Sequence, residues 1–402
     1  MLEHWIWLSR LPKLQIWQKL SLLQHFHDPE ELYNASASAL SHLSAEVVNV
    51  LREKDLTQAH SILRACQEKG IQLVTLQDSA YPRRLRNTAD APLLLYYKGR
   101  LPDWEAQPVI GIVGTREASA YGLTVAKRLS SQISVCGGLV VSGGASGIDT
   151  LALQGALACG KKAVAILACG LDRVYPKSNT ALFDRILEDG CLLSEYPPGE
   201  QPLRWHFPER NRIISGVSDG VLIVEAPYGS GALITADKAL EQGRDVFAVP
   251  GNIDVPVCAG SNALLQGRAA PVLTGWDVMK EYAPLYPAAV SRTEPPVEAL
   301  AAEPEQPQAP KRTRHARASG KFPIDNTVKS PYSGINNPQP ALTPEEKAVL
   351  ALLQAQPVPV DTIISQADLA PNRVLSVLTM LAVKGAVKNH PGGLVSLAEA
   401  KK

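Results

Sequence analysis

Glycines, hydroxyl groups and arginines recur where short aliphatic runs end, and this combination suits anion binding. The stretch SGGASG, residues 142–147, follows two valines and precedes an alanine-rich helical pattern. A glycine turn between a strand and a helix lets backbone N–H groups approach a phosphate, and the helix N-terminus attracts negative charge. We therefore predict a phosphate-binding loop formed by Ser142, Gly143, Gly144, Ser146 and Gly147. The alternative is that these glycines form only a tight structural corner.

Other segments place similar residues after aliphatic runs. Gly114, Thr115 and Arg116 follow VIGIV, and Ser230 and Gly231 open a later helical pattern. The remaining candidate contacts come from YPKSN and FPERNR, namely Lys177, Phe207, Arg210, Asn211 and Arg212. Ligands of open α/β sheets bind outside the carboxyl ends of the strands, so we expect these segments to converge there. Cations beside aromatic rings favour a nucleic-acid backbone as the ligand.

The groups needed for catalysis are not apparent in the sequence. Glu195 and Glu225 stand near strand ends, but Glu195 is as well suited to pairing with an arginine as to acting as a base. The sequence shows no Ser-His-Asp elbow, no metal-ligand spacing and no lysine in a Schiff-base context. We therefore predict a binding protein with no catalytic residue, no metal and no cofactor.

To bring these segments together, the middle of the chain must alternate strands with helices. The expected strands are 93–97, 109–113, 139–141, 163–167, 191–194, 221–224 and 246–249. The helical patterns between them, such as YGLTVAKRLSSQI, predict a doubly wound α/β fold with a mostly parallel sheet.

The flanking segments differ in composition. Residues 1–70 predict short helices, with Asp28 and Pro29 as start signals and Gly70 as a stop signal. The α/β region spans 71–283, and residues 284–340 predict a disordered linker rich in proline and alanine. Residues 341–399 predict three helices and a hairpin, which together suit a winged helix.

Bulk composition limits the possible partners and compartments. The formal net charge of the 402 residues is +1, so any nucleic-acid surface must be a local patch. The six cysteines include no CxxC pair, which favours a reduced, cytoplasmic protein. The first residues make a poor signal peptide, and no apolar run is long enough to insert into a membrane.

Across residues 71–282 the motifs resemble the DNA-processing protein A family (DprA, also called Smf). They include GGLVVSGGASGIDTLALQGAL, GLDRVYPKSN, FPERNRIISGVSDGVLIVEAPYGSGALITADKAL and VFAVPG. The resemblance implies a Rossmann-like fold, a sterile-alpha-motif-like N-terminal domain and a C-terminal winged helix. It also implies a non-enzymatic single-stranded DNA-binding protein of natural transformation that protects incoming strands and loads RecA recombinase. Homodimers through the Rossmann-like domain are implied as well, and the basic pocket carries over to Arg116, Lys177 and FPERNR, with SGGASG beside them.

The sequence departs from the family pattern at several positions. Leu153 stands where the family usually has histidine, and Lys13 and Gln15 stand where glycines are expected in a helical hairpin. In the winged helix, the segment APNRVLSVLTMLAVKG would be the recognition helix, but Arg373 is one of only two cations in it, so a protein-contact role is equally compatible. The basic run from Lys311 to Arg317 is interpreted as a solvated linker that could add phosphate contacts.

Two enzymatic alternatives remain open. A phosphoribohydrolase-like enzyme would be expected to carry a PGGxGTxxE loop, whereas PGGL occurs here only near the C-terminus. A nicotinamide-dependent oxidoreductase would need GxGxxG, and the glycines of SGGASG have a different spacing.

Overall fold

The computed structural model describes residues 1–295 and, towards the C-terminus, residues 344–353, 356, 358–367, 369, 374, 377, 378, 381, 386–390 and 394–397. The chain divides into two compact units, Met1–Lys311 and Arg312–Lys402, which are described separately.

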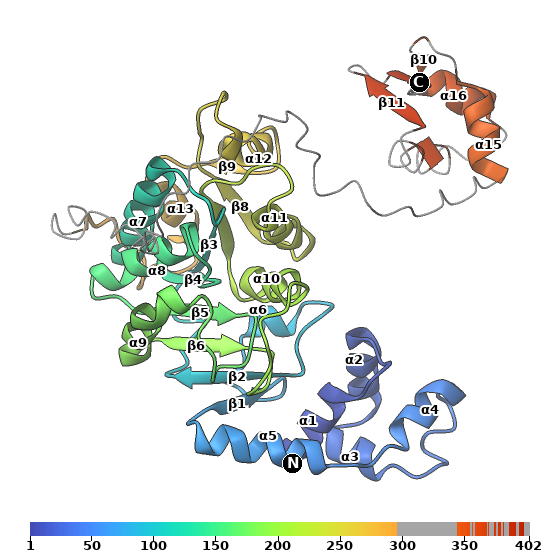
Figure 1. Cartoon of the computed structure of the whole chain (residues 1–402), viewed down its shortest axis with the longest axis vertical. Coiled ribbons are helices and arrows are strands. Elements are labelled where there is room, and N and C mark those ends of the chain that lie inside the picture. Colours follow the sequence, from blue (N-terminus) through green and yellow to red (C-terminus); the bar gives the residue numbers. More distant parts are fainter. Residues whose placement is uncertain are drawn as a thin grey trace, which may run out of the picture. The chain divides into compact units, whose positions relative to one another are not determined.

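A nine-stranded sheet in the order β1-β2-β6-β5-β4-β3-β7-β8-β9 forms the centre of the first unit (Figure 1). The strands are β1 (Gln72–Thr75), β2 (Leu94–Gly99), β3 (Val109–Val113), β4 (Leu139–Ser142), β5 (Ala163–Leu167), β6 (Cys191–Ser194), β7 (Gly220–Ile223), β8 (Asp245–Ala248) and β9 (Ala270–Pro271). Strands β3 to β9 pair in parallel, whereas β2 pairs antiparallel with both β1 and β6. The predicted α/β class and the seven predicted strands are confirmed. The short strands β1 and β9 were not predicted.

Helices cover both faces of the sheet, as a doubly wound fold requires (Figure 1). One face carries α7 (Ala120–Val135), α8 (Ile148–Ala158), α9 (Thr180–Asp189) and α13 (Gly275–Tyr282). The other face carries α6 (Arg83–Arg86), α10 (His206–Val217), α11 (Gly231–Glu241) and α12 (Ala259–Leu264), with η1 (Lys177–Asn179) and η2 (Pro256–Cys258) in the connecting loops.

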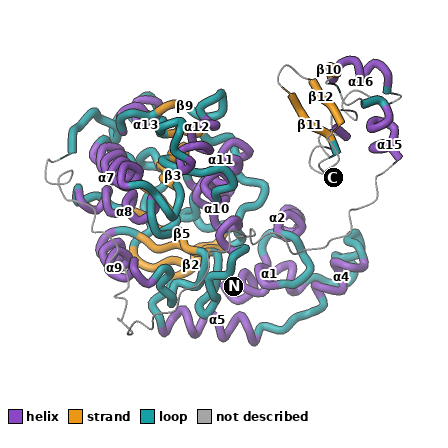
Figure 2. Tube along the Cα trace, turned by 45° about the horizontal axis from the view of Figure 1, so that its top comes forward, coloured by secondary structure: helices purple, strands orange, loops and turns teal. Residues whose placement is uncertain are grey.

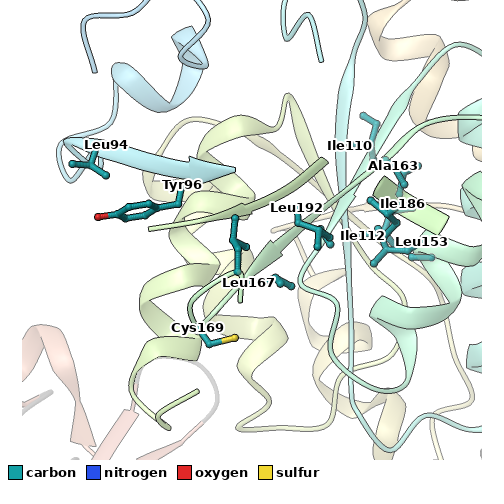
Figure 3. Close-up of a cluster of buried hydrophobic side chains, with 14 of the residues drawn as sticks. Leu94, Tyr96, Ile110, Ile112, Leu153, Ala163, Leu167, Cys169, Ile186 and Leu192 are labelled. Atoms are coloured by element: carbon teal, nitrogen blue, oxygen red, sulfur yellow. The ribbon is translucent and has the colours of Figure 1, made fainter. Parts of the chain in front are cut away.

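Alternate residues of the central strands supply the two cores. Ile110 and Ile112 of β3 join the cluster shown in Figure 3, whereas Val109 and Val113 join the cluster on the opposite face. Side chains of a strand point alternately to either face, so a strand buried on both faces has an uninterrupted apolar sequence. Rigid packing on both faces fixes where the loops after the strands emerge.

The N-terminal segment folds as the predicted short helices. They are α1 (Leu2–Arg10), α2 (Ile16–His25), α3 (Pro29–Asn34), α4 (Ala45–Leu51) and α5 (Thr57–Glu68). Of these, α1 and α5 lie near β2 in Figure 2. The Asp28 side chain accepts hydrogen bonds from the backbone N–H groups of Glu30 and Glu31, as expected of an N-cap. Buried Leu8 and Tyr96 belong to one continuous cluster, so the helices and the sheet pack together.

The first residues of the segment predicted to be a disordered linker are ordered in the structure. Ser291 donates its backbone N–H to the Cys136 carbonyl at 3.2 Å, and Val290 is buried. The Tyr286 hydroxyl donates to the Asp219 carboxylate at 3.2 Å. Residues 284–291 therefore pack on the α/β region, because Tyr286 and Val290 supply apolar surface. The overall proline- and alanine-rich composition of the segment did not indicate this packing. Residues 296–340 of the predicted linker lie outside the described residues.

The second unit contains α15 (Pro344–Ala351), β10 (Val358–Pro359), α16 (Val360–Gln366), β11 (Val387–His390) and β12 (Leu394–Leu397). Its sheet has the order β10-β12-β11, and β11 and β12 form the predicted antiparallel hairpin. Arg373 and the basic run 311–317 lie outside the described residues. Among the helices that the structure describes, none combines the length and the apolar composition needed to cross a bilayer.

Candidate nucleic-acid interface

A pocket of about 870 Å³ opens at the carboxyl edge of the sheet. Its walls come from the turns after β3 and β7, the loop that contains Tyr175, and the first turns of α10 and α11. Strand β3 has β4 on one side and β7 on the other, so the strand order reverses at this point. Such a switch point is where open α/β sheets bind ligands. We call this cavity the switch-point pocket.

Arg116 reaches the switch-point pocket from the turn after β3. Its guanidinium carbon lies 4.5 Å from the centroid of the Phe207 ring. The turns at 114–116 and 143–147 touch, because the Ile148 N–H donates to the Thr115 carbonyl at 3.3 Å. A Cβ on Gly147, whose φ is +82°, would stand 2.5 Å from the same carbonyl oxygen. Within residues 1–295, the Arg116 guanidinium is exposed and makes neither a hydrogen bond nor an ion pair, so its donors are available to a ligand.

Helix α10 presents Phe207, Arg210 and Asn211 to the switch-point pocket. These residues have i, i+3, i+4 spacing and therefore share one face of the helix. The Asn211 amide donates to the Gly231 carbonyl at 3.1 Å, which ties α10 to the start of α11. Ser230 and Gly231 also line the pocket, with the Ser230 hydroxyl accepting from the Ala232 N–H at 3.3 Å.

Arg212 lies on a different face of α10 and does not line the switch-point pocket. Its guanidinium donates to both carboxylate oxygens of Glu195, at 2.5 and 2.7 Å, and to the Asp90 carbonyl at 2.7 Å. Burial acts to lower the pKa of Arg212, but Glu195 and Asp90 outweigh burial and raise it. Glu195 therefore pairs with an arginine. Arg210 and Arg212 are only two positions apart in the sequence. The helical period nevertheless places them on different faces of α10.

The glycine turn is occupied by a side chain of the protein itself, the carboxyl group of Asp149. The buried Asp149 carboxylate accepts from the Ala145 N–H at 3.3 Å, at the start of α8. Arg210, only 4% exposed, donates through Nη1 to the carbonyls of Gly143 and Ile166. Burial raises the pKa of Asp149, while the charge of Arg210 acts in the opposite direction. Helix N-termini favour carboxylates for the same reason that they favour phosphates.

The predicted phosphate loop is accordingly an internal corner for most of its length. The Ser142 hydroxyl donates to the Ile112 carbonyl at 2.6 Å, and Gly143 and Gly144 are buried. Ser146 is exposed, but neither it nor Gly147 lines the switch-point pocket, to which this turn contributes Ala145. Gly114 and Thr115, from the neighbouring turn, do line it.

Several residues of the site were not singled out from the sequence. Arg204, Tyr175 and Tyr228 line the switch-point pocket, and so does Asp149. Arg204 is exposed and stands beside Trp205, which is 61% exposed and so is no core residue. The signal that could have identified Arg204 was its position three residues before Phe207, the first residue of FPERNR. Lys177 is exposed two residues beyond Tyr175 but does not line the pocket.

The groups lining the switch-point pocket include no histidine, cysteine or lysine in the described part of the chain. No cluster of three potential metal-ligating side chains occurs among the described residues. Glu225, the other acid near a strand end, is buried and accepts from the Ser119 hydroxyl at 2.6 Å and from the Ser119 N–H at 2.9 Å. It stabilises the start of α7.

The family model for DNA recombination-mediator protein A matches residues 72–283, the segment that contains the whole switch-point pocket. The chain belongs to the DNA recombination-mediator protein A family. A second family model, the DprA winged helix domain, matches residues 336–393 and confirms the predicted winged helix.

Individual relatives agree with this membership. Protein Smf from Synechocystis is 34% identical over 380 residues, covering 92% of this chain and 92% of that protein. DNA processing protein DprA from Streptococcus pneumoniae is 45% identical over 212 residues, covering 52% of this chain and 73% of that protein. The X-ray structure of DprA from the same species aligns with a TM-score of 0.61 at 36% identity, covering 70% of this chain and 98% of that chain.

Proposed function

We propose that the switch-point pocket binds the sugar-phosphate backbone of single-stranded DNA and leaves it covalently unchanged. The observation that carries this proposal is the pair of exposed guanidinium groups, Arg116 and Arg204, at a pocket with aromatic walls. Neither guanidinium has a hydrogen-bond or ion-pair partner within residues 1–295, unlike Arg210 and Arg212. Unpaired arginines attract phosphates, and aromatic faces accept unpaired bases.

Family membership supports the wider part of the proposal. We infer that the protein protects incoming strands during natural transformation, loads RecA recombinase onto them and forms homodimers through the Rossmann-like region. A cytoplasmic location is compatible with the six cysteines, all of which are free thiols. Lys177, beside Tyr175, is proposed to extend the cationic surface beyond the pocket.

A salt titration tests the backbone contact. Each phosphate neutralised on a single strand contributes about 0.7 to the slope of log K against log salt concentration, so Arg116→Ala should lower the slope by about that amount. Lys161→Ala is the matched control, because Lys161 is exposed just before β5 begins at Ala163, at the opposite edge of the sheet. Equal affinity and slope for Arg116→Ala and the wild type would remove Arg116 from the site.

A mobility shift with single- and double-stranded oligonucleotides of equal length tests strand preference. We expect tighter binding to the single strand, because the aromatic walls need unpaired bases. Incubation with nucleoside monophosphates addresses the phosphoribohydrolase alternative, and release of free base would overturn the non-enzymatic assignment.

A further inference from the structure

Two loops reach the switch-point pocket from strands β5 and β6. We call residues 168–176, after β5, the β5 loop; they contribute Tyr175 to the lining. We call residues 195–205, after β6, the β6 loop; they contribute Pro202 and Arg204. Both loops lie wholly within the described part of the chain and contain no helix or strand. Their conformation therefore depends on contacts from other parts of the protein.

The β5 loop and the β6 loop are bound to each other through residues that do not line the pocket. The Asp172 carboxylate accepts through Oδ1 from the Gly199 N–H at 2.8 Å. The Gly170 N–H donates to the Glu200 carbonyl at 3.1 Å. A Cβ on Gly170 would stand 2.5 Å from the Pro197 carbonyl oxygen, so the two backbones are as close as glycine allows. A displacement of one loop would therefore displace the other.

The N-terminal helices anchor this pair of loops. Lys69, the C-cap of α5, donates through Nζ to Asp172 Oδ2 at 2.6 Å. Both carboxylate oxygens of Asp172 are thus engaged, and its side chain is only 11% exposed. Burial acts to raise the pKa of Asp172, but the hydrogen bonds from Lys69 and Gly199 outweigh burial and lower it. Arg10 of α1 adds a second contact, with its Nη1 atom 3.7 Å from Glu200 Oε2.

These ion pairs are not what attaches the N-terminal helices to the sheet. The apolar cluster that contains Leu8 and Tyr96 makes that attachment. Lys69 and Arg10 are much more exposed, with side chains 42% and 39% accessible. Exposed ion pairs contribute little to the free energy of unfolding. Their effect is instead local, because they fix two loops that have no regular structure of their own.

We propose that the N-terminal helices hold the β5 and β6 loops in place, and that Lys69 and Asp172 are positioning residues for the binding of single-stranded DNA. This inference rests on the proposed function. Neither residue lines the switch-point pocket, so each acts through the loops and not by contact with DNA. Loops that are already held in one conformation lose less entropy when a ligand binds, which increases affinity.

The affinity of the full chain for an oligothymidylate tests this role, and Asp172→Ala is the decisive variant. If only electrostatics changed, removal of a negative charge should tighten the binding of DNA. The positioning role predicts the opposite, a loss of about 3- to 30-fold, because the loops lose both their mutual hydrogen bond and the bond to Lys69. In the Asp172→Ala background, Lys69→Met should cause no further loss.

Lys69→Met separates positioning from a direct phosphate contact. It should weaken binding by about 2- to 5-fold. The slope of log K against log salt concentration should stay unchanged, because no phosphate contact is lost. Lys69→Arg keeps the positive charge and should bind with nearly wild-type affinity.

Hydrogen exchange of the free protein measures the anchoring of the loops without DNA. Backbone amides of residues 168–176 and 195–205 should exchange faster in Asp172→Ala than in the wild type. Arg100→Met is the matched control, because it removes an exposed ion pair with Asp189, just before β6 begins and so at the end of the strand opposite to the β6 loop. Its loop exchange and its affinity for the oligothymidylate should equal those of the wild type.

Tighter or unchanged binding by Asp172→Ala would overturn the positioning role. A lower salt slope in Lys69→Met would overturn it as well, since it would show a direct phosphate contact. Unchanged hydrogen exchange in Asp172→Ala would overturn the anchoring itself. Failure of the wild type to bind the oligothymidylate would instead refute the proposed function, while the exchange rates would still decide whether the loops are anchored, so the two failures are distinguishable.

Discussion

Arg116 and Arg210 both line the switch-point pocket, but substitutions of the two should fail in different ways. Arg210 is buried and its Nη1 atom donates to the carbonyls of Gly143 and Ile166, at the ends of β4 and β5. Arg116 is exposed and has no such partners within residues 1–295. We therefore expect Arg210→Met to lower the free energy of unfolding and Arg116→Met to leave it nearly unchanged.

The magnitude follows from the contacts of Arg210. A buried carbonyl left without its donor costs about 1–3 kcal/mol, and two carbonyls lose theirs. The Asp149 carboxylate also loses a nearby positive charge, which adds to the loss. Part of it is offset, because the Arg210 Nε atom is buried without a partner in the native protein. The net decrease for Arg210→Met is about 2–4 kcal/mol.

Urea denaturation followed by tryptophan fluorescence measures this difference in the full chain. All six tryptophans lie within residues 1–295, so the signal reports the unit that contains the pocket. Arg116→Met is the matched control and should stay within about 0.5 kcal/mol of the wild type. The salt slope for DNA should fall in Arg116→Met and remain unchanged in any Arg210 variant that is still folded under the assay conditions. Wild-type stability for Arg210→Met, or equal destabilisation by both substitutions, would refute the structural role of Arg210.

Two further predictions concern the N-terminal helices. Lys13 has φ of +65°, which glycine tolerates better than lysine, so Lys13→Gly should stabilise the protein by up to about 1 kcal/mol. Gln15 is the N-cap of α2 with φ of −69°, so Gln15→Gly should destabilise the protein. Thermal unfolding of both variants measures these changes. Burial lowers the pKa of Lys19 to about 8 from its ordinary 10.5. Between these two pH values the folded protein binds fewer protons than the unfolded chain. Its stability therefore rises with pH in this range. Lys19→Met should abolish that rise and be more stable at pH 7 by up to about 3 kcal/mol, which denaturation at pH 7, 8 and 10 would check. A pH dependence equal to that of the wild type would contradict it.

Local sequence signals were sufficient for most elements of the fold, although not for the short strands β1 and β9. The apolar runs around Ile110, Val140 and Ile166 are buried on both faces and so required helices on both sides of a parallel sheet. Asp28 and Gly70 marked helix ends, because side-chain capping and a left-handed backbone depend on neighbouring residues alone. Strand β9 has only two residues and was missed for lack of any periodicity.

At Lys13 the backbone keeps the left-handed conformation that a glycine would favour, although the residue is lysine. The departure from the family pattern therefore changes the side chain and adds backbone strain without removing the turn. The resemblance to the family indicated the departure at Lys13, but only the backbone angle showed that the turn persists.

The sequence by itself determined that arginines and glycine turns would gather at one edge of the sheet, because parallel strands direct their carboxyl ends the same way. Tertiary structure alone decided what each charge faces. Arg210 turns inward to the glycine corner, Arg212 is neutralised by Glu195, and Arg116 remains available. Whether a cation is paired depends on residues distant in the chain, such as Glu195 seventeen positions before Arg212, and only the folded packing brings those charges together.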